Sequence, residues 1–290
     1  MPWVQTDSLS FVARHDDEDA AGAQRILDQL EDLRLKLEDR FEVVPGDVTV
    51  IVHSSPIWLS LAHPFLPLVR WSSSQAGRRY LAGWPMATEV HVLNDYWVEQ
   101  RAAGEDSEKA LRRTAERLYV QLVVAANNGE LPPPWDPRRT ARFLSWAWLL
   151  EGAAQYFSGQ TSLFRAAVIT RMRNGGRPSF PPSPRDAILL GGTIFDLLDR
   201  TAGRDACEVL VSRLRKGGPR VNLESAFDAR FEQIETAWRR YLRELTEYRR
   251  SAVELGGGEA PRLPSRLVEE PDEQPRQRRR RQEPGEQTRR

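Results

Sequence analysis

Strand-like segments are confined to the first hundred or so positions of this chain, and only helical periodicity follows them. Val48–Val52 is β-branched, Glu89–Leu93 alternates, and a shorter strand is expected at Phe11–Ala13. Strands and helices that are segregated along a chain are typical of an α+β protein. The sequence therefore predicts an N-terminal strand and helix unit with a small β-sheet over residues 8–100, and a mainly helical half over residues 101–250.

Helices are predicted where apolar residues recur at spacings of three and four. The first covers residues 19–41, and the next covers residues 106–128 with a continuous apolar stripe. A proline-rich link (LPPPWDP) then leads into a helix that begins near Arg138. The last predicted helix, FDARFEQIETAWRRYLREL, places Phe227 and Leu245 on one apolar side. We expect residues 8–250 to form one domain.

The segment 251–290 differs in composition from the rest of the chain. It is rich in Gly, Pro, Glu, Gln and Arg and has almost no apolar content, which is typical of a disordered tail. Its most concentrated feature is a run of four arginines: Arg278, Arg279, Arg280 and Arg281. These arginines are either a solvated stretch or a weak contact with nucleic acid or anionic lipid.

Charge and composition exclude several classes of protein. The 42 basic and 41 acidic residues give a net charge of +1, which argues against nucleic-acid binding through overall charge. The single cysteine, Cys207, excludes a disulfide framework and is expected to be a buried thiol. Neither a secretory signal nor a membrane-spanning run is present, so we expect a cytoplasmic protein.

The common catalytic constellations are missing: the chain has no GxSxG, no Walker loop and no GxGxxG. Its four histidines all lie in the first third of the sequence. No two of them have the spacing of metal ligands, so each is interpreted as a loop or strand histidine. They are His15, His53, His63 and His91.

Tryptophan is abundant around the predicted loops of the N-terminal unit. Four indoles fall there, at Trp58, Trp71, Trp84 and Trp97. They indicate either an apolar groove for a peptide or core packing, and core packing is favoured for Trp84 and Trp97.

One pattern in the helical half is distinctive. The segment WLLEGAAQYFSG, Trp148–Gly159, resembles the third-ligand helix of gluzincins, the thermolysin-like or peptidase MA-like metallopeptidases, in which a glutamate and a glycine follow tryptophan as W-x-x-E-G. The order of elements also fits, because a strand–helix–strand unit and the helix at 106–128 precede it. The resemblance covers roughly residues 8–245. It implies a zincin-like fold in which Glu151 stands at the position of the third zinc ligand.

The resemblance also implies that A-E-R-L-Y, Ala115–Tyr119, stands where that family carries HExxH. Glu116 matches the general base, but Ala115 and Tyr119 replace both zinc-binding histidines. The family motif works because residues at i and i+4 share a helix face and converge on one metal ion. Alanine has no ligand atom, and a tyrosine hydroxyl with a pKa near about 10 is a poor ligand at neutral pH. A degenerate, metal-free site is therefore expected, with no cofactor.

Several arrangements of these residues are compatible with the sequence. Tyr119 would pack against the helix that carries Glu151 and fill the volume of the lost metal. Glu116 would either face Glu151, so that repulsion raises one pKa, or pair with Arg112 one turn earlier. A different metal or an imported ligand is a further alternative.

Three functions follow from these observations. The first is a pseudoenzyme, a non-catalytic peptidase MA-like protein that binds a peptide or partner protein in the former active-site cleft. The second is an active zinc metallopeptidase that uses Glu116 as base and Glu151 as ligand. The third is an adaptor that binds nucleic acid or an anionic membrane through its arginine-rich tail.

Overall fold

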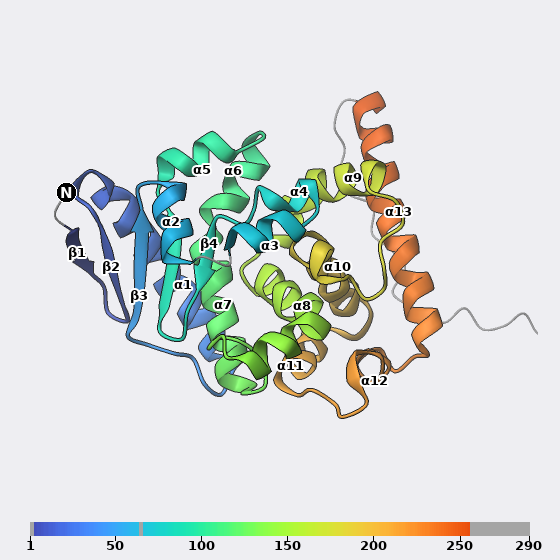
Figure 1. The fold of residues 1–290 in the computed structure, drawn as a ribbon. Coiled ribbons are helices and arrows are strands. Elements are labelled where there is room, and N and C mark those ends of the chain that lie inside the picture. Colours follow the sequence, from blue (N-terminus) through green and yellow to red (C-terminus); the bar gives the residue numbers. More distant parts are fainter. Residues whose placement is uncertain (1–2, 64–65, 256–290) are drawn as a thin grey trace, which may run out of the picture.

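The computed structural model describes residues 3–63 and 66–255, and it has the α+β architecture expected from the sequence (Figure 1). The strands come first: β1 (Trp3–Asp7), β2 (Phe11–Asp16), β3 (Val48–His53), β4 (Gly83–Pro85) and β5 (Glu89–Leu93). Between them lie η1 (Asp17–Asp19), α1 (Ala20–Glu38), α2 (Pro56–Ala62), α3 (Leu66–Ser72) and α4 (Gln75–Arg78). After them come α5 (Asp95–Arg101), α6 (Glu105–Arg112), α7 (Thr114–Asn127), α8 (Pro137–Phe157), η2 (Thr161–Phe164), α9 (Arg165–Asn174), α10 (Pro184–Ala202), α11 (Arg204–Ser212), α12 (Gly218–Phe227) and α13 (Phe231–Leu255).

The sheet has the strand order β1-β2-β3-β5-β4. β2, β3 and β5 are parallel, whereas β1 and β4 run antiparallel at the two edges. Because successive side chains alternate between the faces of a strand, the register fixes which residues share a face. His91 lies opposite Ile51, so His91 and His53 project from the same side of the sheet. The opposite side carries a fully buried set: Val50, Val52, Val90 and Val92.

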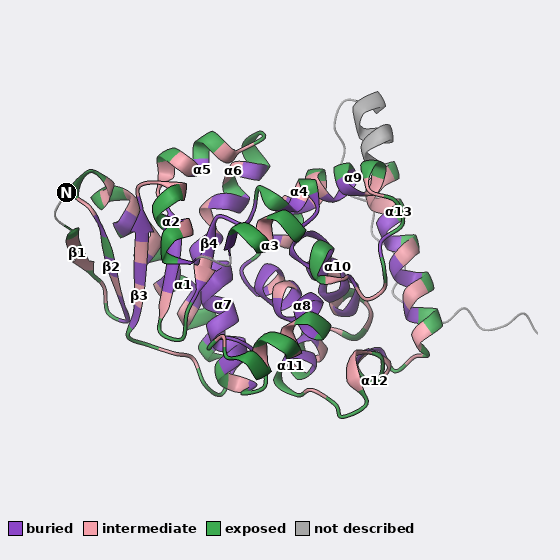
Figure 2. Cartoon of the chain, in the orientation of Figure 1, coloured by how far each residue is buried: buried purple, intermediate pink, exposed green. Residues whose placement is uncertain are grey.

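Helices α1 and α7 cover this valine-rich side, and α2 packs on the other side (Figure 1). The helix α1 is amphipathic, and the leucines predicted to form its stripe are buried: Leu27, Leu30, Leu33 and Leu37. The helix α7 is different, because every residue from Thr114 to Ala125 is buried (Figure 2). It therefore lies at the centre of the molecule, between the sheet and the helical half. A single buried cluster extends from Phe11 to Leu242.

The structure corrects two details of the sequence prediction within the first 128 residues. The helix expected at 106–128 is divided into α6 and α7 at Arg113, where the Thr114 hydroxyl donates to the Leu111 carbonyl oxygen at 2.5 Å. The region expected to be loop between β3 and β5 contains α2, α3, α4 and the short strand β4. The Ser55 hydroxyl caps α2 by accepting from the backbone N–H of Ile57 at 3.2 Å.

The other differences lie at the ends of the chain. The strand β1 was not predicted because its side chains alternate only between exposed and half-buried positions. The last predicted helix begins later than expected, at Phe231, because Asp228 adopts φ 47° and ends a separate helix, α12, which was not predicted from the sequence. The helix α13 continues to Leu255, so residues 251–255 of the predicted tail are helical, and residues 256–290 lie outside the described residues. None of the described helices combines the length and apolar character needed to span a bilayer.

Candidate functional site

The W-x-x-E-G pattern lies on α8, and its glycine marks a close approach of α8 to α10. A Cβ on Gly152 would approach the backbone carbonyl carbon and oxygen of Gly191, on α10, at 2.7 Å. Only two glycines that face each other allow α8 and α10 to come so near. Gly152 therefore fixes the position of α8, and with it the direction in which the neighbouring Glu151 projects.

Glu151 points toward α7 and pairs there with an arginine. The distance from Nη1 of Arg117 to Oε2 of Glu151 is 2.7 Å. The Arg117 side chain is 1% exposed and that of Glu151 is 12% exposed, so the ion pair is almost completely shielded from water. Nε and Nη2 of Arg117 find no hydrogen-bond partner among the described residues. A buried cation thus stands directly opposite the carboxylate that the resemblance places in a metal site.

The structure does not bring Ala115, Glu116 and Tyr119 to Glu151. The Tyr119 hydroxyl donates to the carbonyl oxygen of Pro45 at 2.6 Å, and its ring packs edge-on against Phe11 of β2. Ala115 lines a small crevice with side chains of α1 and β5. These residues therefore lie on the side of α7 that faces the sheet and α1.

Glu116 is buried, but its environment differs from both arrangements expected from the sequence. Burial raises the pKa of Glu116 to about 7, and the positive charges of Arg113 and Lys36 partly oppose that shift. Repulsion by Glu151 is not the cause. Arg112, the other expected partner, pairs instead with acidic residues around α5 and α6: Asp95, Glu99 and Glu108.

Arg117, two positions after Ala115, lies on the face of α7 that meets Glu151. By helical periodicity the residue that shares this face one turn later is Gln121, which is 1% exposed. The i, i+4 pair opposite Glu151 is therefore Arg117 and Gln121. This donor set does not fit zinc, because a guanidinium has no lone pair to offer and repels a cation. Among the side chains described, those of residues 3–63 and 66–247, no three from His, Cys, Asp or Glu are arranged to hold a metal ion.

Comparison with known proteins gives no further guide, because no family model, curated protein or solved structure matches this chain.

Three histidines that are far apart in the sequence meet on the side of the sheet that α2 covers. Nε2 of His53 lies 3.0 Å from Nδ1 of His91, and the rings of His63 and His91 pack edge-on with centroids 4.1 Å apart. Nε2 of His91 also reaches a carboxylate oxygen of Glu89 at 3.3 Å. His15 lies elsewhere and bonds to the Thr6 hydroxyl. Spacing along the chain could not reveal this trio, because parallel pairing of β3 and β5 joins His53 to His91, and the packing of α2 on these strands adds His63.

All three imidazoles are held in an environment that disfavours their charged form. Burial, together with the smaller effect of neighbouring imidazoles, lowers the pKa of His53 and His91 to about 4. Burial also lowers the pKa of His63. The trio is therefore neutral at pH 7.

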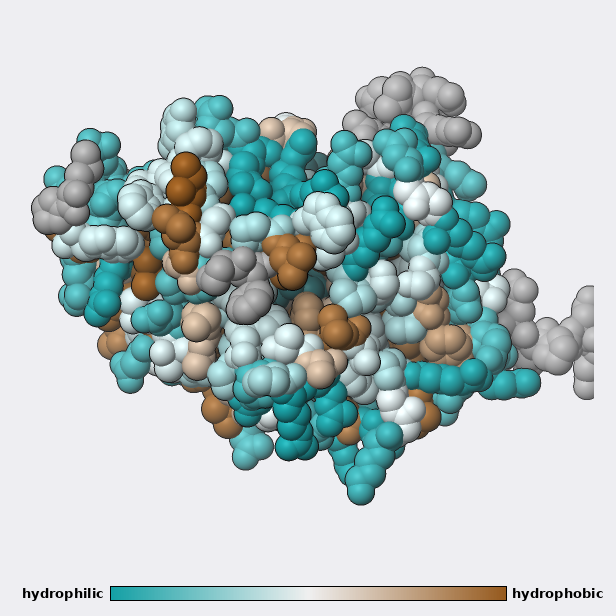
Figure 3. Space-filling view, in the orientation of Figure 1, coloured by the Kyte–Doolittle hydropathy of each residue, from teal (hydrophilic) through white to brown (hydrophobic). Residues whose placement is uncertain are grey.

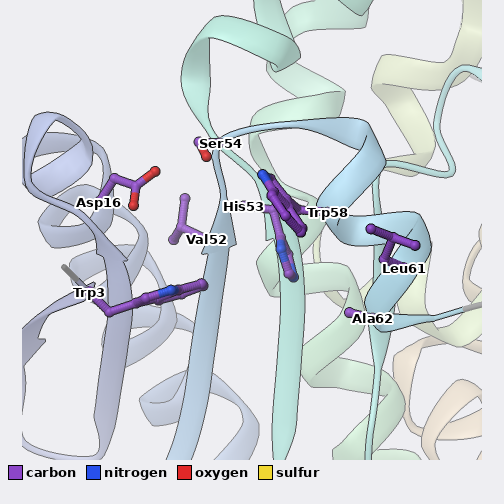
Figure 4. A pocket seen from close by; sticks show the side chains of 8 residues that line it. All are labelled: Trp3, Asp16, Val52, His53, Ser54, Trp58, Leu61 and Ala62. Atoms are coloured by element: carbon purple, nitrogen blue, oxygen red, sulfur yellow. The ribbon is translucent and has the colours of Figure 1, made fainter. Parts of the chain in front are cut away.

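A cavity of about 490 Å³ opens beside His53, at the carboxyl ends of β2 and β3 (Figure 4). Such edges are the usual place for ligands in sheets with parallel strands. Its lining combines two indoles, one carboxylate and small or apolar groups: Trp3, Asp16, Val52, His53, Ser54, Trp58, Leu61 and Ala62. Apolar side chains also gather over α2 and α3 on the face drawn in Figure 3, where Ile57, Leu61 and Leu68 are all more than half exposed.

The four tryptophans divide as follows. Trp58 and Trp71 are exposed, at 60% and 74%. The Trp84 ring lies tilted against Trp135 with centroids 4.7 Å apart, and Nε1 of Trp97 donates to the carbonyl oxygen of Ser54. Trp84 and Trp97 are both half-buried and pack against the core. Core packing is thus confirmed for Trp84 and Trp97.

Cys207 is a buried thiol, as predicted, whose Sγ lies 3.5 Å from the carbonyl oxygen of Phe195. Burial raises its pKa to about 12, so it is not a nucleophile at neutral pH. The arginine run Arg278–Arg281 lies outside the described residues.

Proposed function

We propose that this chain is a non-catalytic protein with a peptidase MA-like scaffold, a pseudoenzyme that acts by binding rather than by hydrolysis. The observation that carries the proposal is the ion pair between Arg117 and Glu151. A fixed guanidinium occupies the space opposite the carboxylate and supplies the positive charge that a metal would supply. The order of elements, with a strand and helix unit before α7 and α8, supports the same scaffold.

The chemistry of the pair argues against hydrolysis at this place. A zinc ion in a peptidase activates water by lowering its pKa and polarises the scissile carbonyl. A guanidinium remains protonated at all physiological pH values, so it does not serve as a base, and it coordinates no water as a Lewis acid. Glu116, the residue that matches the family's base, projects about 100° round α7 from Arg117, and the charges that act on it are those of Arg113 and Lys36.

Metal analysis of the purified protein tests the proposal. We expect far less than one zinc per chain and no change of Tm on addition of a chelator, since a bound structural or catalytic metal would stabilise the fold. Stoichiometric zinc, or a peptidase activity that chelator removes and Glu116→Ala abolishes, would establish the active metallopeptidase instead.

A pair of rebuilt variants tests which face of α7 meets Glu151. Arg117→His with Gln121→His places two imidazoles at i and i+4 opposite Glu151, and zinc affinity should rise well above that of the wild type. Ala115→His with Tyr119→His is the matched control, because it places the same two imidazoles toward Pro45 and α1, and it should gain nothing. Circular dichroism checks that both variants fold. A gain confined to the control would contradict the proposed site.

A further inference from the structure

We propose that the cavity between Trp3 and Trp58 is a binding site for an organic cation, such as a quaternary ammonium group. The geometry that points to it is a row of side chains across three neighbouring strand ends. Trp3 lies directly opposite Asp16 in the β1–β2 register. The last β2–β3 pair is Arg14 and Ile51, and the two strands end two residues later, at Asp16 and His53. The inference does not depend on whether the α7–α8 site ever held a metal.

The carboxylate of Asp16 supplies the charge that selects a cation. It is half-buried, and it makes no hydrogen bond or ion pair with another side chain in the part of the chain that the structure describes. Among the residues that the structure describes, no arginine or lysine lines the cavity. Asp16 is also the first of four consecutive acidic residues at positions 16–19, whose field attracts cations to this end of the sheet. Arg14 is exposed on the same strand but is not part of the lining.

Two indoles supply the walls. Trp3 is 53% exposed and Trp58 is 60% exposed, and both turn toward the cavity (Figure 4). The Trp3 ring meets His53 edge-on with centroids 6.3 Å apart, which holds it over the sheet. An indole face is the best aromatic partner for a cation, and a quaternary ammonium group is the ligand that such walls favour because it is charged and only weakly hydrated.

The remaining lining is consistent with this ligand. His53 is neutral at pH 7 because burial lowers its pKa to about 4, so it does not repel a cation. Leu61 and Ala62 offer methyl groups to the alkyl part of the ligand. A volume of about 490 Å³ lies within the range of ordinary small-molecule sites.

Titration of the full chain with choline, followed by calorimetry and by tryptophan fluorescence, tests the inference. The neutral isostere 3,3-dimethylbutan-1-ol is the matched ligand, because it has the same shape without the charge. We expect choline to bind at least about tenfold more tightly than the isostere. Equal affinities, or no binding of choline at millimolar concentration, would overturn the proposal.

Variants then assign the binding to the cavity. Asp16→Asn and Trp58→Ala should each weaken choline binding by about tenfold, whereas Trp58→Phe should retain part of it. The matched controls are Asp32→Asn and Trp71→Ala, which change the same residue types outside both the lining and the acidic run, and they should leave the affinity unchanged. Because Trp58 is largely exposed, its replacement should not unfold the chain, and Tm confirms this. Loss of binding in Trp71→Ala but not in Trp58→Ala would place the site elsewhere and contradict the inference.

Discussion

The α7–α8 interface and the cavity at the carboxyl ends of β2 and β3 differ in whether their charged side chains are paired. In the interface, Arg117 and Glu151 satisfy each other inside the protein, and almost no surface of either is exposed. On the sheet, Asp16 has no partner among the described side chains, and the indoles beside it are more than half exposed. Charges that are paired internally hold helices together, whereas a charge left unpaired beside exposed rings is available to a ligand. The difference therefore separates a structural site from a candidate binding site.

The largest effect is expected from breaking the buried pair. Arg117→Met leaves the Glu151 carboxylate shielded from water without its cation, and such a loss costs about 3–5 kcal/mol of unfolding free energy. Urea denaturation measures it. The double variant Arg117→Met, Glu151→Leu removes both charges and should recover most of the loss. A single variant as stable as the wild type would show that the pair does not hold the interface.

The next effect concerns the contact that positions Glu151. Gly152→Ala places a methyl group against the Gly191 backbone and should destabilise the fold by about 1–3 kcal/mol through overpacking. Gly129→Ala is the control, because no atom lies within 4 Å of its added Cβ, and its stability should change little. Thermal and urea unfolding compare the two. Equal stability of both variants would contradict the close approach of α8 and α10.

Removal of the Glu116 charge should stabilise the protein, whereas the substitutions at Arg117 and Gly152 should destabilise it. Its pKa of about 7 in the folded protein exceeds the unfolded value of 4.5, so the stability that its protonated form contributes is present below pH 4.5 and is lost as pH rises through 7. Glu116→Gln should therefore stabilise the protein at pH 8, by about 1–3 kcal/mol, and the difference should disappear toward pH 4.5. Urea unfolding at the two pH values measures it. A Gln variant that is less stable at pH 8 would show that the Glu116 charge is needed.

The smallest effect concerns the histidine trio. The folded pKa of His53 and His91, about 4, lies below the unfolded value of 6.5, so the stability from their neutral forms is present above pH 6.5 and is lost as pH falls toward 4. Carboxylates also titrate in this pH range, so the test compares how steeply Tm falls with pH in each variant and in the wild type. His91→Gln should flatten the fall of Tm between pH 6.5 and 4, whereas His15→Gln, outside the trio, should not. Identical slopes would contradict the lowered pKa values.

Sequence patterns located the parts of the candidate site but not their relative orientation. The motif on α8 contains Glu151 and Gly152, and both residues make close contacts with a neighbouring helix. The partner on α7 was predicted wrongly, as Tyr119 or Glu116 rather than Arg117. The reason is physical: α7 is buried on all sides, so its apolar periodicity does not tell which side faces α8 and which faces the sheet.

By itself, the sequence determined the class of fold and the position of the main helices, because segregated strand and helix patterns and the leucine stripe of α1 are local properties of the chain. Only the tertiary structure decided which distant side chains meet. The trio of His53, His63 and His91 and the row of Trp3, Asp16 and His53 depend on strand order and register, which join residues far apart in the sequence. The pairing of Arg117 with Glu151 likewise depends on how α7 is rotated between its neighbours, a choice that packing on all its sides makes.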